Sequence, residues 1–262
     1  MFSENRYNIF MITKNDLDKG NVPDHIITAL ETIGNHGFHA VIVGGAVRDL
    51  LLGVVPIEYD LASSARPEDI ENIFENTTNI GKEFGTIIVH LAGHAIEITS
   101  YRKESGYHDS RRPDQIEFSQ SIYDDLKRRD FTMNAMAYNP ITDEFFDEFN
   151  GLNHLNERRL VCVGDPNIRF TEDTLRPFRC FRFMSQLGCI VDSDIMRSLD
   201  ALSDSPLPAM ERIRQEMDRL LLGPFWLSAL NVMDRSGWLE RILKHSVELP
   251  RDVEIPRELL YR

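Results

Sequence analysis

Hydrophobic positions along the chain follow two different patterns, one before about residue 138 and one after about residue 151. In the first part, short apolar runs alternate with stretches of helical period. This pattern predicts helices near 24–36, 46–52 and 67–76, strands at 39–43, 85–91 and 95–99, and a further strand through Glu58 and Asp60. A short turn containing Gly93 separates two of these strands, which predicts a hairpin. From residue 151 onward apolar residues recur three and four positions apart, as in amphipathic helices. The sequence therefore predicts an α/β first half and an all-helical second half.

Composition narrows the class of protein. The chain has 262 residues, 42% of them hydrophobic, and contains no apolar run near the ~18 residues that a membrane helix requires. Its first residues lack the basic start and apolar core of a signal peptide, so we expect a cytoplasmic protein. Cys162, Cys180 and Cys189 stand among apolar residues without metal-ligand spacing, which predicts buried free thiols.

The net charge of −13 argues against nonspecific adhesion to nucleic acid, because such binding needs a field of clustered cations. Any contact with RNA is therefore expected to be local. Basic residues do gather in the middle of the chain, with acidic neighbours that partly cancel them. These are Arg111-Arg112, Lys127-Arg128-Arg129, Arg158-Arg159, Arg176, Arg179 and Arg182.

The stretch from Val41 to Asp49 predicts a phosphate-binding turn. A β-branched run ends in Gly44 and Gly45, and an amphipathic segment follows, which is the order of strand, tight turn and helix. Glycines let the backbone approach an anion without a Cβ in the way, while the helix dipole and Arg48 add positive potential. The alternative is an ordinary Gly-Gly turn.

Two acids farther along predict a metal site. Glu58 and Asp60 alternate with Tyr59 on the expected strand, so both carboxylates are expected on one face. Neighbouring carboxylates repel unless a divalent cation lies between them, which indicates Mg²⁺-assisted chemistry on a nucleoside triphosphate. Glu97 is a third acid of this site if its strand neighbours that of Asp60, and otherwise a solvent-facing strand residue.

Two further constellations predict contacts to ribose and base. Arg129 offers a donor to phosphate, and Asp130 is able to accept a hydrogen bond from a ribose 2′-OH. With Thr171 as the expected N-cap, Asp173 and Arg176 lie three apart on one helix face. Such a pair is either a structural salt bridge or, beside the phosphate site, an acceptor and donor that pair with a base edge.

Taken together, these motifs resemble those of the class II tRNA nucleotidyltransferases, which are the CCA-adding enzymes and their A-adding, CC-adding and bacterial poly(A) polymerase relatives. The motifs occur in family order over about residues 40–222, and their combination is highly specific. They are Gly44-Gly45-Ala46-Val47-Arg48-Asp49, Tyr59-Asp60-Leu61-Ala62, Glu97-Ile98-Thr99, Arg111-Arg112-Pro113, the run 128–135, Arg169-Phe170-Thr171-Glu172-Asp173 with Arg176, Arg179 and Arg182, and Glu211-Arg212-Ile213-Arg214 with Glu216.

The resemblance implies an α+β fold, with a nucleotidyltransferase head built on a small mixed sheet flanked by helices and followed by an all-helical neck. Turn residues and an acidic segment near residue 140 agree with a boundary there. The expected parts are an N-terminal extension at 1–22, the catalytic head at 23–140, a nucleotide-reading neck at 141–225 and a partial helical body and tail at 226–262.

The resemblance also implies roles for particular residues. Gly44, Gly45 and Arg48 would hold the triphosphate, and Glu58 and Asp60 would occupy the two metal-binding positions. Further nucleotide contacts would come from Arg129 and Asp130 to phosphate and ribose, from Asp173 and Arg176 to the base of ATP or CTP, and from Arg179 and Arg182.

Some positions depart from the family pattern. Glu58 stands where the family has Asp, and its extra methylene moves the carboxylate by about a bond length. Pro177 follows Arg176, where it kinks the expected helix unless it lies in the first turn. The segment 102–113 matches the flexible loop that A addition requires in this family, which favours CCA or A addition.

We therefore expect an Mg²⁺-dependent enzyme that transfers CMP or AMP from CTP or ATP to the 3′ end of tRNA, with no membrane association. Two alternatives remain open at this stage. One is a degenerate member that binds nucleotide without chemistry. The other is a transferase of poly(A) polymerase type that acts on another acceptor.

Overall fold

A computed structural model describes residues 11–106 and 115–243, and its largest element is a seven-stranded mixed sheet. The strand order is β3-β4-β5-β2-β1-β8-β9. All neighbours are antiparallel except β2 and β5, which are parallel. The strands are β1 (Ala40–Val43), β2 (Asp60–Ser63), β3 (Thr77–Gly81), β4 (Thr86–Leu91), β5 (His94–Ser100), β8 (Ala137–Asn139) and β9 (Glu144–Phe146).

Strand β1 lies in the middle of the sheet, and all four of its residues are buried. Ala40 and Ile42 belong to one hydrophobic cluster, whereas Val41 and Val43 belong to a second. The strand is thus covered on both faces, which explains why its sequence is an unbroken apolar run rather than an alternating one.

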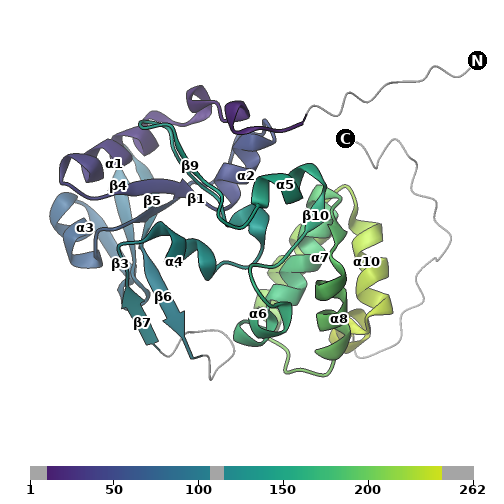
Figure 1. Cartoon of the computed structure of the whole chain (residues 1–262). Helices are drawn as coiled ribbons and strands as arrows, with labels where there is room; N and C mark the ends of the chain where they lie inside the picture. The colour runs from purple at the N-terminus through teal and green to yellow at the C-terminus, as the bar shows by residue number, and fades with distance from the viewer. Residues whose placement is uncertain (1–10, 107–114, 244–262) are drawn as a thin grey trace, which may run out of the picture.

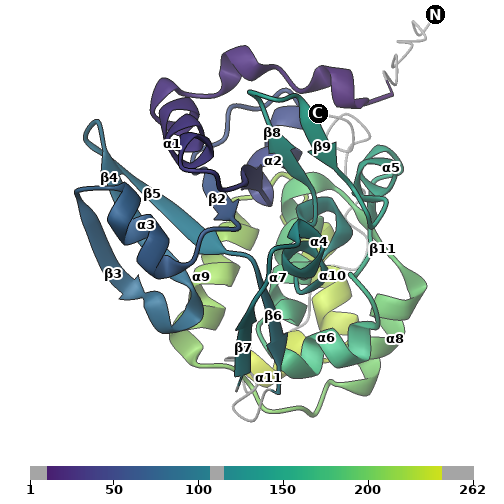
Figure 2. The ribbon, with the colours of Figure 1, turned by 60° about the vertical axis from the view of Figure 1, so that its left-hand side comes forward.

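Short helices cover the two faces of this sheet. Helices α1 (Asp24–Asn35) and α3 (Pro67–Ile73) lie side by side against one face, as Figure 2 shows, and α2 (Gly45–Leu51) follows β1 directly. Leu126 of α4 (Ile122–Lys127) belongs to the cluster on the other face. The expected helices and the mixed sheet are therefore confirmed.

The predicted hairpin is formed by β4 and β5. Ala92 and Gly93 connect the strands, with φ values of 51° and 81°. Positive φ at both turn residues matches the right-handed twist of an antiparallel pair. Strand β6 (Arg102–Ser105) pairs antiparallel with β7 (Gln115–Phe118), and residues 107–114, which include Arg111-Arg112-Pro113, lie outside the described residues.

The second half is mainly helical and lies beside the sheet, on the right in Figure 1. Its helices are α5 (Gly151–Asn156), α6 (Pro166–Glu172), α7 (Arg176–Leu187), α8 (Ser193–Ala201), α9 (Met210–Leu221), α10 (Trp226–Arg235) and α11 (Trp238–Leu243). One departure from the helical prediction is a parallel two-residue pairing of β10 (Arg159–Leu160) with β11 (Ile190–Val191).

Helix α7 is the centre of this half and packs against α9 and α10. Phe178 and Phe181 of α7 contact the fully buried ring of Trp238, whose indole N–H donates to the Leu199 carbonyl at 2.9 Å.

The three cysteines are buried and free, as predicted. None of the helices in residues 11–106 and 115–243 is long and apolar enough to span a membrane.

Candidate functional site

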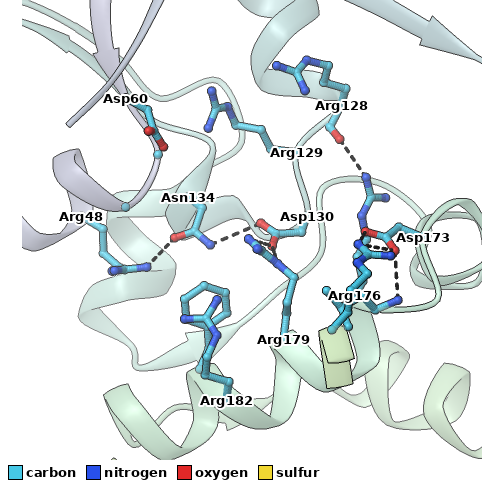
Figure 3. A pocket seen from close by; sticks show the side chains of 15 residues that line it. Arg48, Asp60, Arg128, Arg129, Asp130, Asn134, Asp173, Arg176, Arg179 and Arg182 are labelled. Carbon is cyan, nitrogen blue, oxygen red and sulfur yellow. Dashed lines mark hydrogen bonds and ion pairs between the residues drawn. The ribbon is translucent and has the colours of Figure 1, made fainter. Parts of the chain in front are cut away.

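An arginine-rich cavity of about 370 Å³ lies between the sheet and the helical half (Figure 3). We call it the arginine cavity, because seven arginines line it together with three aspartates. The charged residues are Arg48, Arg128, Arg129, Arg176, Arg179, Arg182, Arg212, Asp60, Asp130 and Asp173. Such an excess of cations suits a polyanionic ligand.

The glycine turn forms one wall of this cavity. Gly44 has φ 75° and ψ −133°, a conformation essentially restricted to glycine, and its N–H donates to the Met136 carbonyl at 3.2 Å. A Cβ at this position would lie 2.8 Å from Nη1 of Arg129. Gly45 then begins α2, and Arg48 follows one turn later. The turn therefore places bare backbone beside two arginines, of which only Arg48 was expected there from the sequence.

A chain of hydrogen bonds links Arg48 to Asp130 across the cavity (Figure 3). Nη1 of Arg48 donates to Oδ1 of Asn134 at 2.7 Å, and Nδ2 of Asn134 donates to Oδ1 of Asp130 at 3.2 Å. Asn134 was not predicted as a site residue, although it lies in the run 128–135. Because its partner Arg48 is 86 positions away, no local spacing rule identifies this role.

Asp130 is buried and is held by several donors. Nε of Arg179 lies 2.6 Å from Oδ2, and the Phe131 N–H lies 2.7 Å from Oδ1. Burial opposes ionisation, but the charges of Arg179 and Arg176 and the Phe131 amide together lower the pKa of Asp130 to about 2. Asp130 is therefore ionised at neutral pH and orients Arg179 within the cavity.

The ring of Phe183 lies beneath three of the arginines. The guanidinium carbons of Arg182, Arg48 and Arg179 lie 3.9, 5.3 and 5.7 Å from its centroid. Stacking of this kind holds a guanidinium in place while leaving its other N–H groups available. Arg182 is also anchored by Glu216 of α9, because its Nε donates to Oε2 of that residue.

Arg128 and Arg129 share a single buried carboxylate. Nη2 of Arg128 lies 2.6 Å from Oδ1 of Asp125, and Nη2 of Arg129 lies 2.9 Å from Oδ2. Burial opposes ionisation of Asp125, and the two arginines more than compensate, so its pKa lies below the ordinary value. The Arg129 side chain is thereby directed toward Gly44.

Asp173 and Arg176 do not lie on one helix face, and that prediction is wrong. Asp173 is the C-cap of α6, and Arg176 is the first residue of α7, so the helix is interrupted between them. Thr171 is likewise an interior residue of α6 rather than an N-cap, and its hydroxyl donates to the Asn167 carbonyl. Pro177 lies in the first turn of α7, where its missing N–H costs no helical bond.

The two residues have separate partners. Arg176 donates to Glu172 at 2.8 Å and to the Arg128 carbonyl at 3.1 Å. Asp173 accepts from Nη2 of Arg212 at 3.2 and 3.3 Å. Both residues still line the arginine cavity. The sequence did not predict that Arg212 holds Asp173, because the two residues are 39 positions apart along the chain.

Of the acids predicted as metal ligands, only Asp60 lines this cavity, whereas Glu58 and Glu97 line a neighbouring one. Only Asp60 is on β2, at its first residue, whereas Glu58 lies in the preceding loop, so the expectation that both acids share a strand is wrong. Desolvation raises the pKa of Asp60, Glu58 raises it further, and Arg129 and Arg179 oppose the rise. The carboxylates of Glu58 and Asp60 therefore interact electrostatically.

Glu97 belongs to the neighbouring strand, because β5 pairs with β2. Desolvation raises its pKa, and Asp60 and Glu58 add to the effect. Within residues 11–106 and 115–243, however, no three His, Cys, Asp or Glu side chains form a group able to hold a metal ion. A metal-binding role for Glu97 therefore stays a prediction.

Comparison with known proteins shows which enzymes this chain resembles. Residues 40–161 match the model of the poly A polymerase head domain. The chain is 42% identical over 212 residues to the CCA-adding enzyme of Bacillus pumilus, an alignment that covers 80% of this chain and 52% of that enzyme. It is 42% identical over 224 residues to the CCA-adding enzyme of Lactococcus lactis, covering 82% and 56%.

A solved structure agrees. The Bacillus stearothermophilus CCA-adding enzyme in complex with CTP superposes with a TM-score of 0.74 at 36% identity, covering 82% of this chain and 52% of that one. The chain thus spans about half the length of the relatives it matches. Residues 40–161 therefore match a poly A polymerase head domain, and the chain resembles CCA-adding enzymes over about half of their length.

Proposed function

We propose that this protein transfers AMP or CMP from ATP or CTP to the 3′ end of tRNA. The observation that carries the proposal is the arginine cavity, which is bordered by Asp60 and by the glycine turn. Its size and charge suit a nucleoside triphosphate, and relatives at about 40% identity are CCA-adding enzymes. We further propose the domain limits given above, with a head at 23–140 and a neck at 141–225.

The acids beside the cavity fit magnesium. Desolvation raises the pKa of both Asp60 and Glu97, and the charge of Glu58 adds to both shifts. Asp60 raises the pKa of Glu97 further, whereas Arg129 and Arg179 oppose the rise at Asp60, so the three acids lie close enough to interact. Mg²⁺ is commonly bound by one or two carboxylates together with substrate phosphates and water. We infer that Glu58 and Asp60 would hold it. When bound, the ion supplies charge neutralisation and polarisation of the phosphate oxygens.

In the proposed reaction, the 3′ oxygen of the RNA forms a bond to the α-phosphorus of the nucleotide. The bond from that phosphorus to the bridging oxygen of the β-phosphate breaks, pyrophosphate leaves and the hydroxyl proton is released to solvent. Arg48, Arg129 and Arg179 stabilise the charge that develops on the leaving pyrophosphate. Their orientation is fixed in advance by Asn134, Asp125 and Asp130, so little reorganisation is required.

The neck side of the cavity is suited to select the base. Asp173 offers an acceptor and Arg176 a forked donor, and both line the cavity. Each is fixed by a second residue, Asp173 by Arg212 and Arg176 by Glu172. A rigid acceptor and donor can pair with the edges of adenine and cytosine and leave guanine and uracil unpaired.

Transfer is tested with the purified chain, Mg²⁺, labelled ATP or CTP, and tRNA transcripts that lack the terminal A or the whole CCA end. We expect incorporation at the 3′ end, and its loss in Asp60→Ala. Glu75→Ala, which removes an exposed acid elsewhere in the head, is the matched control and should retain activity. Absence of turnover with every RNA primer would contradict the proposal.

A second candidate function is nucleotide binding without transfer. The observation in its favour is Glu58, which lies outside the arginine cavity and before the strand that carries Asp60. Titration calorimetry that shows ATP binding, combined with no incorporation into any RNA, would support this function.

We also propose a cytoplasmic location. The three thiols are free rather than paired, which is usual in a reducing compartment. Fractionation of cells that express a tagged chain tests this proposal.

A further inference from the structure

A second cavity, of about 470 Å³, borders Asp60. We call it the histidine cavity, because His25 and His94 line it together with Ile57, Glu58 and other residues of α1, β4 and β5. Asp60 is the one described residue that lines both this cavity and the arginine cavity.

The sheet explains why Asp60 separates the two cavities. Strand β2 lies between β5 and β1. Strand β5 contributes His94 and Glu97 to the histidine cavity, whereas the turn after β1 contributes Gly44 to the arginine cavity. Because Asp60 is the first residue of β2, its carboxylate stands at the border of both spaces.

The two cavities have opposite chemistry. Among the described residues that line the histidine cavity there is no lysine or arginine, so it offers no cationic side chain to a triphosphate. Instead, the rings of His25 and His94 stack with centroids 3.9 Å apart and planes within 4°, and the nearby residue Ile57 is 98% exposed. Flat rings and an uncovered aliphatic side chain are the surfaces on which an unpaired nucleobase stacks.

In-line substitution at phosphorus fixes where the acceptor must enter. The attacking oxygen approaches the α-phosphorus from the side opposite the leaving pyrophosphate. If the arginine cavity holds the pyrophosphate portion, the attacking hydroxyl arrives past Asp60 from the side that lacks arginines. The histidine cavity occupies that side.

We infer that the histidine cavity binds the 3′-terminal nucleoside of the acceptor RNA, with its base against His25, His94 and Ile57 and its ribose toward Asp60. This inference rests on the proposed function. His25, His94 and Ile57 are positioning residues in this arrangement, because they orient the acceptor and do not contact the reacting phosphorus.

Kinetics with a tRNA transcript that lacks the terminal A test the inference. We expect His94→Ala and Ile57→Ala each to raise KM for this RNA about tenfold and to leave KM for ATP unchanged. His94→Phe retains a flat ring and should restore KM for the RNA to within about twofold of the original. Matched controls are His36→Ala and Ile190→Ala, which remove an exposed histidine and an exposed isoleucine outside this cavity and should change neither constant.

A binding experiment is independent of turnover. The same transcript, with 4-thiouridine as its 3′-terminal nucleoside, is photocrosslinked to the chain, and the modified peptide is identified by mass spectrometry. Crosslinks within residues 56–60 or 94–97 support the inference. Crosslinks confined to other peptides, or no crosslink, overturn it.

The outcomes for the two proposals are separable. Normal incorporation with unchanged KM for RNA in His94→Ala overturns the assignment of the histidine cavity and leaves the proposed transfer intact. Absence of incorporation by the original chain contradicts the proposed transfer, and in that case the crosslinked peptide still decides whether RNA occupies the cavity.

Discussion

Two nitrogens of Arg179 contact one oxygen of Asp130 and so connect the helical half to the segment that follows α4. Nε and Nη2 lie 2.6 and 2.5 Å from Oδ2, and the side chain of Asp130 is 7% exposed. An ion pair this sheltered is weakly screened by solvent and salt. It is therefore the contact through which protonation should loosen the cavity.

The first prediction concerns acid stability. The pKa of Asp130 falls from an ordinary 3.8 to about 2 in the folded chain, so folding favours the ionised form. The resulting stabilisation, on the order of 2 kcal/mol, is present above about pH 4 and is lost as the pH falls toward 2. The difference in unfolding free energy between the original chain and Asp130→Asn should shrink over that range in urea titrations.

Asp218→Asn serves as the control for this experiment. Its carboxylate is 65% exposed and lies 3.8 Å from Arg214, so the pair contributes little. We expect it to follow the original chain at every pH. A constant difference between Asp130→Asn and the original chain from pH 5 to pH 2 would refute the assignment.

The second prediction compares two glycines in the head. Gly44→Ala forces a Cβ into a backbone conformation with φ 75° and to 2.8 Å from Arg129, which should cost about 1–3 kcal/mol of stability and weaken ATP binding. Gly34→Ala lies in a helix with nothing within 4 Å of the new Cβ, and should be neutral or slightly stabilising. Thermal unfolding and calorimetric titration with ATP measure both effects. Equal behaviour of the two variants would contradict a special role for the turn.

The third prediction concerns choice of base. Arg212 holds the carboxylate of Asp173, so Arg212→Ala should lower the preference for ATP over GTP about tenfold, judged by kcat/KM for incorporation. The neighbouring Arg214→Ala removes a 75% exposed guanidinium from the same helix and should leave the preference intact. Loss of stability should stay below about 1 kcal/mol, because the Arg212 pair is only partly buried. An unchanged preference would show that Asp173 does not depend on Arg212.

The fourth prediction concerns Glu58, which stands where the resembled family has Asp. Glu58→Asp shortens the side chain by one methylene, and if Glu58 binds Mg²⁺ imperfectly the change should raise the incorporation rate about tenfold. Mg²⁺ affinity, measured by calorimetry without RNA, should rise in parallel. Glu75→Asp is the control, since this exposed acid lies outside both cavities. A rate that stays at zero in Glu58→Asp would favour the binding-only function.

Local features of the sequence predicted the head well, because they depend on short segments. The apolar run of β1, the glycine pair after it and the hairpin around Gly93 each have a direct steric or periodic signature. The structure preserves all of them. The predicted fold class is therefore confirmed down to the order of its first elements.

The sequence alone did not predict which side chains contact the site residues. Helical spacing suggested that Asp173 and Arg176 share a face, but the helix ends at Glu172 and a new one begins at Arg176. Asn134 and Arg212 act on residues 86 and 39 positions away, at distances along the chain where periodicity carries no information. Contacts of this kind are set by how the helical half packs against the sheet.

The buried ring of Trp238 gives this chain a built-in optical reporter. Both tryptophans of the sequence, Trp226 and Trp238, lie in the helical half, so intrinsic fluorescence excited at the indole band monitors that half alone. Circular dichroism monitors the sheet and the helices together. A gap between the two melting curves would reveal that the halves come apart in separate steps, and coincident curves would show that they melt as a single cooperative unit.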